Sequence, residues 1–218
     1  MLDLEAARRQ MIEQQVRAWD VLDLRILDAM KRTPREAYVP AACRELAFAD
    51  MNVPISHGQA MLSPSLEGRI LQSLELKPED TVFEVGTGTG YFAACLGALT
   101  RAVRSVEIFP DLADGAREAL RRGGVHNVSV AAADVYALPA GPERYDVVVL
   151  TGSLPVYDTR FERMLQPGGR LFAIVGSGPA MEARRVVCSA PGQCVRESLF
   201  ETFVDPLIHA AEPPKFVF

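Results

Sequence analysis

Apolar residues recur at helical spacing in the first part of the chain and in short continuous runs in the second part. Between residues 4 and 31 they fall three or four positions apart, which predicts two amphipathic helices that break near Asp20. The same spacing over residues 65–76 predicts a third helix, with Pro64 suited to its first turn. Residues 47–64 carry Asn, Pro, His and Gly at irregular intervals and predict a loop. Its apolar content leads us to expect an ordered loop that lies over a site.

Strand and helix patterns alternate from Thr81 onward. Short apolar runs predict strands at residues 81–85, 102–108, 128–132, 145–150, 170–175, 184–188 and 195–207. Helical patterns lie between them from residue 91 and at residues 111–122 and 157–165. Repeated βα units predict an α/β fold with a doubly wound, mostly parallel seven-stranded sheet, whose last two strands are antiparallel. We expect one domain over residues 1–218, with residues 1–76 as an N-terminal elaboration and residues 77–218 as the ligand-binding core.

A glycine-rich turn follows the first predicted strand of the sheet. Gly86, Gly88 and Gly90 alternate with threonines, and Tyr91 opens the next helix. Ligands of open α/β sheets bind at the carboxyl ends of the strands, so this turn predicts a binding site. No lysine follows Gly90, which excludes a phosphate-binding P-loop, and Tyr91 stands where a dinucleotide motif needs its last glycine. A nucleoside ligand without a pyrophosphate, S-adenosylmethionine, remains as the third candidate.

Two acids at predicted strand ends favour that third candidate. Glu107 ends the second strand, where a carboxylate can bind ribose hydroxyls, and Asp134 follows the third strand, where it can reach the adenine amine. Glu84 lies within the first strand and either contacts the ligand or caps the next helix. The residues predicted to contact S-adenosyl-L-methionine are Glu84, Gly86, Thr87, Gly88, Gly90, Glu107, Ile108, Asp134 and Val135.

With these features the sequence resembles class I S-adenosylmethionine-dependent methyltransferases, and more narrowly the protein-L-isoaspartate O-methyltransferases. The resemblance rests on residues 30–40, which are similar to the family's "VPRExFVP" segment, on residues 47–59, similar to its "AYxDxPLPIGxGQ" loop, and on residues 84–91. It implies a Rossmann-like methyltransferase fold and an acceptor carboxylate in damaged proteins. It also implies that Ile55, Gln59, Ala60 and Leu62 face the substrate.

The chain departs from this family where the acceptor is expected to bind. Family members carry threonine and serine where this chain has Ala60 and Leu62, so the catalytic residue is unassigned, with Ser63 and His57 as the remaining candidates. Asp205 also interrupts the family's closing "VPLVG" segment. The acceptor is therefore either a protein or peptide carboxylate or a small molecule. A binding module without turnover is the third alternative.

Composition narrows the possible partners. The formal net charge is −5 and no basic block occurs, which argues against nucleic acid and anionic membranes as partners. The N-terminus lacks a secretory pattern and no apolar run is long enough to span a membrane, so we expect a cytoplasmic protein. The four cysteines form no CxxC pair and are expected to be reduced core residues. We expect no metal, and a monomer or weak dimer remains open.

Overall fold

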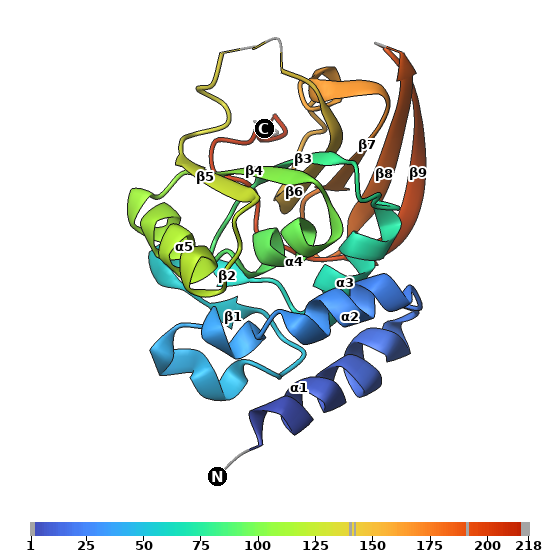
Figure 1. The fold of residues 1–218 in the computed structure, drawn as a ribbon. Coiled ribbons are helices and arrows are strands. Elements are labelled where there is room, and N and C mark those ends of the chain that lie inside the picture. Colours follow the sequence, from blue (N-terminus) through green and yellow to red (C-terminus); the bar gives the residue numbers. More distant parts are fainter. Residues whose placement is uncertain (1–2, 140, 142, 191, 215–218) are drawn as a thin grey trace.

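A seven-stranded sheet forms the centre of the computed structural model, which describes residues 3–139, 141, 143–190 and 192–214 (Figure 1). Its strand order is β5-β4-β3-β6-β7-β8-β9. The strands are β3 (Thr81–Val85), β4 (Ala102–Glu107), β5 (Val128–Ala132), β6 (Tyr145–Leu154), β7 (Leu165–Val175), β8 (Met181–Ala190) and β9 (Gln193–Thr202). Strands β3 to β7 pair in parallel and β7-β8-β9 pair antiparallel. The predicted fold class is confirmed.

The α-helices gather on one face of this sheet (Figure 1). They are α1 (Leu4–Met11), α2 (Leu24–Arg32), α3 (Pro64–Ser73), α4 (Tyr91–Leu99) and α5 (Pro110–Arg122). After α1 the chain continues as a π-helical turn, η1 (Ile12–Val16), and a 3-10 turn, η2 (Arg17–Trp19), and it then breaks at Asp20, where φ is 62°. The predicted break is therefore in place. Among the described residues, no helix has the length and apolar character needed to cross a bilayer.

A buried arginine joins the N-terminal segment to the rest of the chain. Arg35, in the 3-10 turn η3 (Arg35–Ala37), is fully buried and forms an ion pair with Glu67 of α3. A second guanidinium nitrogen donates to the carbonyl of Leu62 over 2.6 Å, and the guanidinium lies 4.8 Å from the ring centroid of Tyr91 in α4. One side chain thus contacts α3, α4 and the segment that leads into α3. Burial raises the pKa of Glu67 to about 7, and the charge of Arg35 opposes that rise.

The opposite face of the sheet carries less helix than the sequence predicts. The expected helix over residues 157–165 is wrong except for a 3-10 turn, η6 (Glu162–Met164), and β7 already begins at Leu165. The cause is strand pairing, because Leu165 lies opposite Tyr145 across a bulge and draws the Pro-Gly-Gly stretch into β7. Fully buried Phe161 still covers this face of the sheet.

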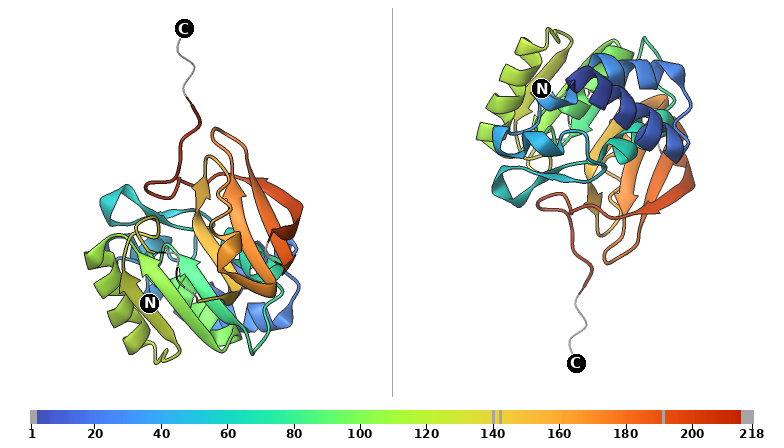
Figure 2. Two further views of the ribbon diagram at one scale, coloured as in Figure 1. Left: turned by 90° about the horizontal axis from the view of Figure 1, so that it is seen from above. Right: turned by 90° about the horizontal axis from the view of Figure 1, so that it is seen from below.

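The predicted loop over residues 47–64 contains regular structure. A 3-10 turn, η4 (Ala41–Leu46), precedes a small antiparallel pair of strands, β1 (Val53–Pro54) and β2 (Ala60–Met61), and a further 3-10 turn, η5 (Ser56–Gly58), connects the two strands. The buried side chains of Val53 and Met61 lie opposite each other in this pair, which explains why the apolar residues of the loop are ordered. The pair lies next to the carboxyl ends of the parallel strands (Figure 2).

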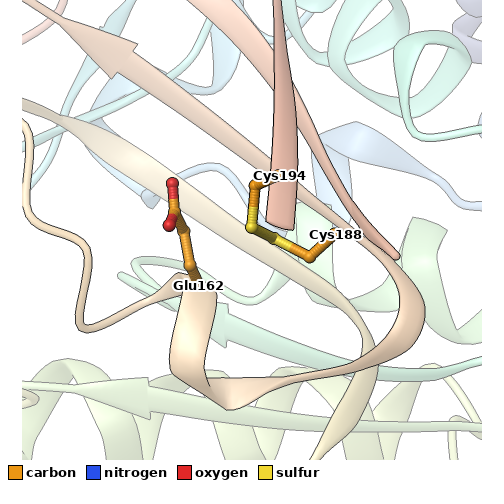
Figure 3. Close-up of side chains that lie close together, drawn as sticks. All are labelled: Glu162, Cys188 and Cys194. Carbon is orange, nitrogen blue, oxygen red and sulfur yellow. A yellow bond between two sulfur atoms is a disulfide. The ribbon is translucent and has the colours of Figure 1, made fainter. Parts of the chain in front are cut away.

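The expectation of four reduced cysteines is wrong for one pair. Cys188 of β8 and Cys194 of β9 lie opposite each other in the hairpin and form a disulfide (Figure 3). Glu162 lies beside this pair, but its carboxylate accepts hydrogen bonds from the Tyr157 hydroxyl at 2.6 Å and from Arg196 at 2.5 Å. In this arrangement the sulfurs bond to each other and the carboxylate is engaged. The prediction of no metal stays a prediction.

Reduction of the disulfide is expected to destabilise the hairpin modestly. The two cysteines are six residues apart, and the loss of so short a closed loop corresponds to about 2 kcal/mol of unfolding free energy. Urea unfolding with and without dithiothreitol measures the difference. A Cys194→Ser variant cannot form the bond and should show no dependence on the reductant. Equal stability of the wild-type chain under both conditions would contradict the expectation.

Candidate functional site

Two adjoining cavities open where the parallel strands end. The main cavity encloses about 810 Å³, part of it open to solvent. Its lining comes from the carboxyl ends of β3, β4 and β6 and from the segment after β5. Further lining residues lie within residues 52–62 and 204–208. A smaller cavity adjoins the main one, and the two share Ala60, Leu62, Gly86, Gly88 and Thr151. The predicted site at this edge of the sheet therefore coincides with a real depression.

The glycine turn begins with a sharp change of direction after β3. Gly86 has φ of +94°, a conformation that favours glycine, and its N–H donates to the carbonyl of Val106 over 2.9 Å. The hydroxyl of Thr151, in the second half of β6, donates to the carbonyls of Val85 and Gly86 over 3.0 and 2.8 Å. The turn is thus held between its two neighbouring strands. The sequence reasoning missed Thr151, although its place after a buried strand is a signal that could have revealed it.

Glu107 has the position predicted for the ribose-binding acid. It ends β4, is nearly buried and lines the main cavity. Its carboxylate accepts hydrogen bonds from the N–H of Gly88 over 2.9 Å and from the N–H of Phe109 over 3.1 Å. These bonds fix the carboxylate against the glycine turn. Ile108 also lines this cavity.

Asp134 combines a turn-capping role with a place at the cavity. One carboxylate oxygen accepts from the N–H of Tyr136 over 2.8 Å, and the other lies 2.8 Å from Nδ1 of His209. Asp134 and Val135 both line the main cavity. The two interpretations of this acid, turn cap and ligand contact, are therefore compatible.

Glu84 lies beneath the glycine turn and lines neither of the two cavities formed by the described residues. It does not cap α4, whose first position is taken by Gly90 without a side-chain hydrogen bond. The carboxylate is fully buried and neither oxygen has a hydrogen-bond partner among the described residues. Burial raises the pKa of Glu84 to about 8, and the nearby Ser105 hydroxyl, bonded to Thr87, opposes this only in part.

Thr87 and Gly90 complete the predicted cofactor set. Thr87 lines the smaller cavity, while Gly90 begins α4 and lies outside both cavities of the described residues. Contact of these residues and of Glu84 with a cofactor stays a prediction.

The substrate-side residues come together as expected. Ile55, Gln59, Ala60 and Leu62 all line the main cavity, and Ala60 and Leu62 also line the smaller one. Ser63 begins α3, and its hydroxyl accepts from the N–H of Leu66 over 3.4 Å and lies 3.2 Å from the hydroxyl of Ser65. Ser63 lines neither cavity of the described residues, so the hydroxyl nearest to the lost serine position caps a helix.

His57 fastens the β1–β2 connection to α5. Its ring stacks on Phe109 with centroids 4.0 Å apart, and Nε2 lies 2.8 and 2.9 Å from the carboxylate oxygens of Asp111. Proximity to His57 lowers the pKa of the exposed Asp111. The imidazole lines neither cavity formed by the described residues, which favours a positioning role over proton transfer.

A C-terminal crossing segment, residues 204–209, supplies a wall of the cavity that the sequence reasoning missed. The buried Ser153 of β6 donates its N–H to the carbonyl of Asp205 and accepts from the N–H of Leu207, both over 2.9 Å. At its other end the segment reaches Asp134 through His209. It therefore crosses from β6 towards the end of β5, beside the β1–β2 pair (Figure 2).

Comparisons with known proteins agree on one family. The family model for protein-L-isoaspartate(D-aspartate) O-methyltransferase matches residues 6–209. A protein-L-isoaspartate O-methyltransferase of Koribacter versatilis is 37% identical over 92% of this chain and 90% of its own length. One from Methanoculleus marisnigri is 37% identical over 83% and 82%. The crystal structure assigned as a Plasmodium falciparum beta-aspartate methyltransferase, in complex with S-adenosyl-L-homocysteine, has a TM-score of 0.80 at 18% identity, over 92% of this chain and 97% of that one.

Adding a methyl group at Gly86 is expected to disrupt the site. A Cβ atom there would lie 2.2 Å from Oγ1 of Thr151, on a backbone with φ of +94°. Gly86→Ala should lower the unfolding free energy by about 1–3 kcal/mol and weaken binding of S-adenosylhomocysteine in calorimetry. Gly115→Ala, in an open position of α5, is the control and should raise stability by about 0.5–1 kcal/mol. Similar effects of the two substitutions would refute this explanation.

The buried carboxyl of Glu84 predicts a specific dependence of stability on pH. Burial raises its pKa from the ordinary value of 4.5 to about 8 in the folded chain, so the folded state holds a proton that the unfolded state releases. The contribution of Glu84 to the unfolding free energy is fully present below pH 4.5 and is lost as the pH rises through 8. Glu84→Gln should therefore gain unfolding free energy relative to wild type across this window, by at most about 1.4 kcal/mol per pH unit. Denaturant titrations at pH 5 and 8 measure the trend, and a constant difference would contradict it.

Proposed function

Because the chain belongs to the protein-L-isoaspartate(D-aspartate) O-methyltransferase family, we propose that it methylates isoaspartyl carboxylates of damaged proteins or peptides. The observation that carries the proposal is the single depression that joins the glycine turn and Glu107 to Ile55, Gln59, Ala60 and Leu62. A methyl donor and an acceptor can meet only where both sets of residues line one space.

Membership in this family confirms the predicted family and the predicted class of enzyme, an S-adenosylmethionine-dependent methyltransferase. The cytoplasmic location remains our proposal. The expectation that all four cysteines are reduced does not support it, because Cys188 and Cys194 form a disulfide.

The chain offers a suitable set of contacts for the methyl donor. When bound, S-adenosylmethionine supplies a methyl group on a positively charged sulfur. The nearly buried Glu107 carboxylate would accept hydrogen bonds from the ribose hydroxyls, and the backbone at Gly86 and Gly88 would leave room for the amino-acid part. Asp134, held by Tyr136 and His209, would face the adenine amine. A positively charged donor also suits a cavity whose charged lining residues are acids.

The acceptor side of the cavity needs no base. A carboxylate is already ionised at neutral pH and is itself the nucleophile, so the protein has to position it and exclude water. Leu62 and Ile55 form apolar walls, and the carbonyl of Leu62 is fixed by Arg35. Gln59 lines the same space and can donate amide N–H groups to the acceptor. These residues would orient the carboxylate next to the glycine turn.

A second candidate function follows from the apolar character of this wall. Ala60 and Leu62 line both cavities and offer no hydroxyl, while Ser63 is held at the start of α3. A more apolar acceptor, such as a small-molecule carboxylate or a phenol, also fits these contacts.

Methylation of an isoaspartyl peptide tests the proposed function. We expect labelled methyl groups from S-adenosylmethionine to enter a peptide with one isoaspartyl residue and not its normal aspartyl counterpart. Glu107→Gln should raise the KM for the methyl donor about tenfold, because a charged acceptor at the ribose position is lost. Glu79→Gln removes the same charge before β3, at the opposite end of the strands, and should leave this KM unchanged.

The same assay separates the two acceptor classes. Absence of label from the isoaspartyl peptide would contradict the proposal and favour either a small-molecule acceptor or a binding module without turnover. The double variant Ala60→Thr with Leu62→Ser then tests the physical reason. Activity gained by this variant over an inactive parent would trace the loss to the two missing hydroxyls, and no gain would exclude them as the main cause.

A further inference from the structure

The main cavity divides into two halves that follow the strand order. Glu107, Ile108, Ala133, Asp134 and Val135 lie at the ends of β4 and β5. The other half lies at the ends of β3 and β6 and contains Gly86, Thr151 and the substrate-side residues. With the ribose and adenine contacts in the first half, the acceptor has to enter the second half.

Asp205 belongs to the acceptor half. It lines the main cavity and is exposed, so it lies at the mouth. Its backbone is fixed to the end of β6, because its carbonyl accepts from Ser153 and the preceding carbonyl, of Val204, accepts from the Ser153 hydroxyl over 3.1 Å. The position of Asp205 is therefore determined by main-chain bonds and does not depend on the charge of its side chain.

The charges around the cavity are all of one sign. Three acids line the main cavity, and Lys, Arg and His are absent from its lining as far as the chain is described. Glu107 is engaged by two backbone N–H groups and Asp134 by Tyr136 and His209. The Asp205 carboxylate has no hydrogen bond or ion pair with any described residue. Among the acids of this lining in the described chain, it is therefore the one whose carboxylate has no partner before an acceptor enters.

We propose that Asp205 selects isoaspartyl acceptors whose neighbouring residues are basic and disfavours those whose neighbours are acidic. The inference rests on the proposed function, since it names the class of acceptor for the same site. Consecutive Cα atoms across a trans peptide bond are about 3.8 Å apart, and the isoaspartyl linkage adds one methylene to the main chain. The side chains next to the isoaspartyl residue therefore lie about one screening length, about 8 Å at physiological salt, from the methylated carboxylate. Lysine or arginine at these positions would give the Asp205 carboxylate a positively charged partner, which the cavity lining lacks, whereas glutamate would add repulsion.

Two matched isoaspartyl peptides test the proposal, one with lysines on both sides of the damaged residue and one with glutamates. For the wild-type chain we expect kcat/KM to favour the lysine peptide by on the order of fivefold at low salt, with the ratio falling towards one at high salt. Asp205→Asn should reduce the ratio at low salt, and Asp205→Lys should reverse it. Glu79→Gln, with the same loss of charge at the opposite end of the strands, should leave the ratio unchanged.

The possible results are distinguishable. Methylation of neither peptide overturns the proposed function and this inference with it. Methylation of both without a preference for lysine overturns the inference alone. A preference that persists in Asp205→Asn and Asp205→Lys assigns it to the net charge of the chain and also overturns the role of Asp205. An unchanged KM for the methyl donor in both variants shows that the donor site is intact and that the change of ratio arises at the acceptor.

Discussion

The buried ion pair between Arg35 and Glu67 is the constraint on which the apolar cavity wall at Leu62 depends. A charged pair removed from water is favoured when its remaining groups form hydrogen bonds, and Arg35 uses one of its donors on the carbonyl of Leu62, while its Nε has no partner among the described residues. The position of a cavity residue is therefore tied to an interaction in the core. Glu67 itself lines the smaller cavity, so the same carboxylate belongs both to the packing of α3 and to the surroundings of the site. Removal of either partner alone would leave an uncompensated buried charge next to Leu62.

Much of the proposed methyl-donor site could be predicted because it follows local rules. A buried strand, a glycine turn and a helix predict where a ligand binds, and parallel pairing brings the end of β4 beside the turn, so Glu107 could be placed without the structure. The capping role of Asp134 also follows from its position after β5. These features depend on residues close in sequence or on the known geometry of βα units.

The parts that escaped prediction depend on contacts between distant residues. The C-terminal crossing segment is fixed by Ser153, about fifty positions earlier, and no periodic pattern indicates such a return of the chain. The disulfide forms because the register of β8 and β9 places Cys188 opposite Cys194, and spacing in the sequence does not give a register. The short pairing of Val53 with Met61 is likewise a tertiary effect, since both strands have only two residues. For the crossing segment the competing local signal was a strand pattern over residues 195–207, whereas β9 ends at Thr202, and for the β1–β2 pair it was an irregular stretch.

Strand β6 carries both fixed walls of the cavity. Thr151 holds the glycine turn and Ser153 holds the crossing segment, and two residues of extended chain separate them by no more than about 7 Å. The distance between the two points where these walls are attached is therefore set by the covalent geometry of β6. The remaining wall, the β1–β2 pair, does not belong to β6, and its connection to α5 is the exposed contact of His57 with Asp111 and Phe109.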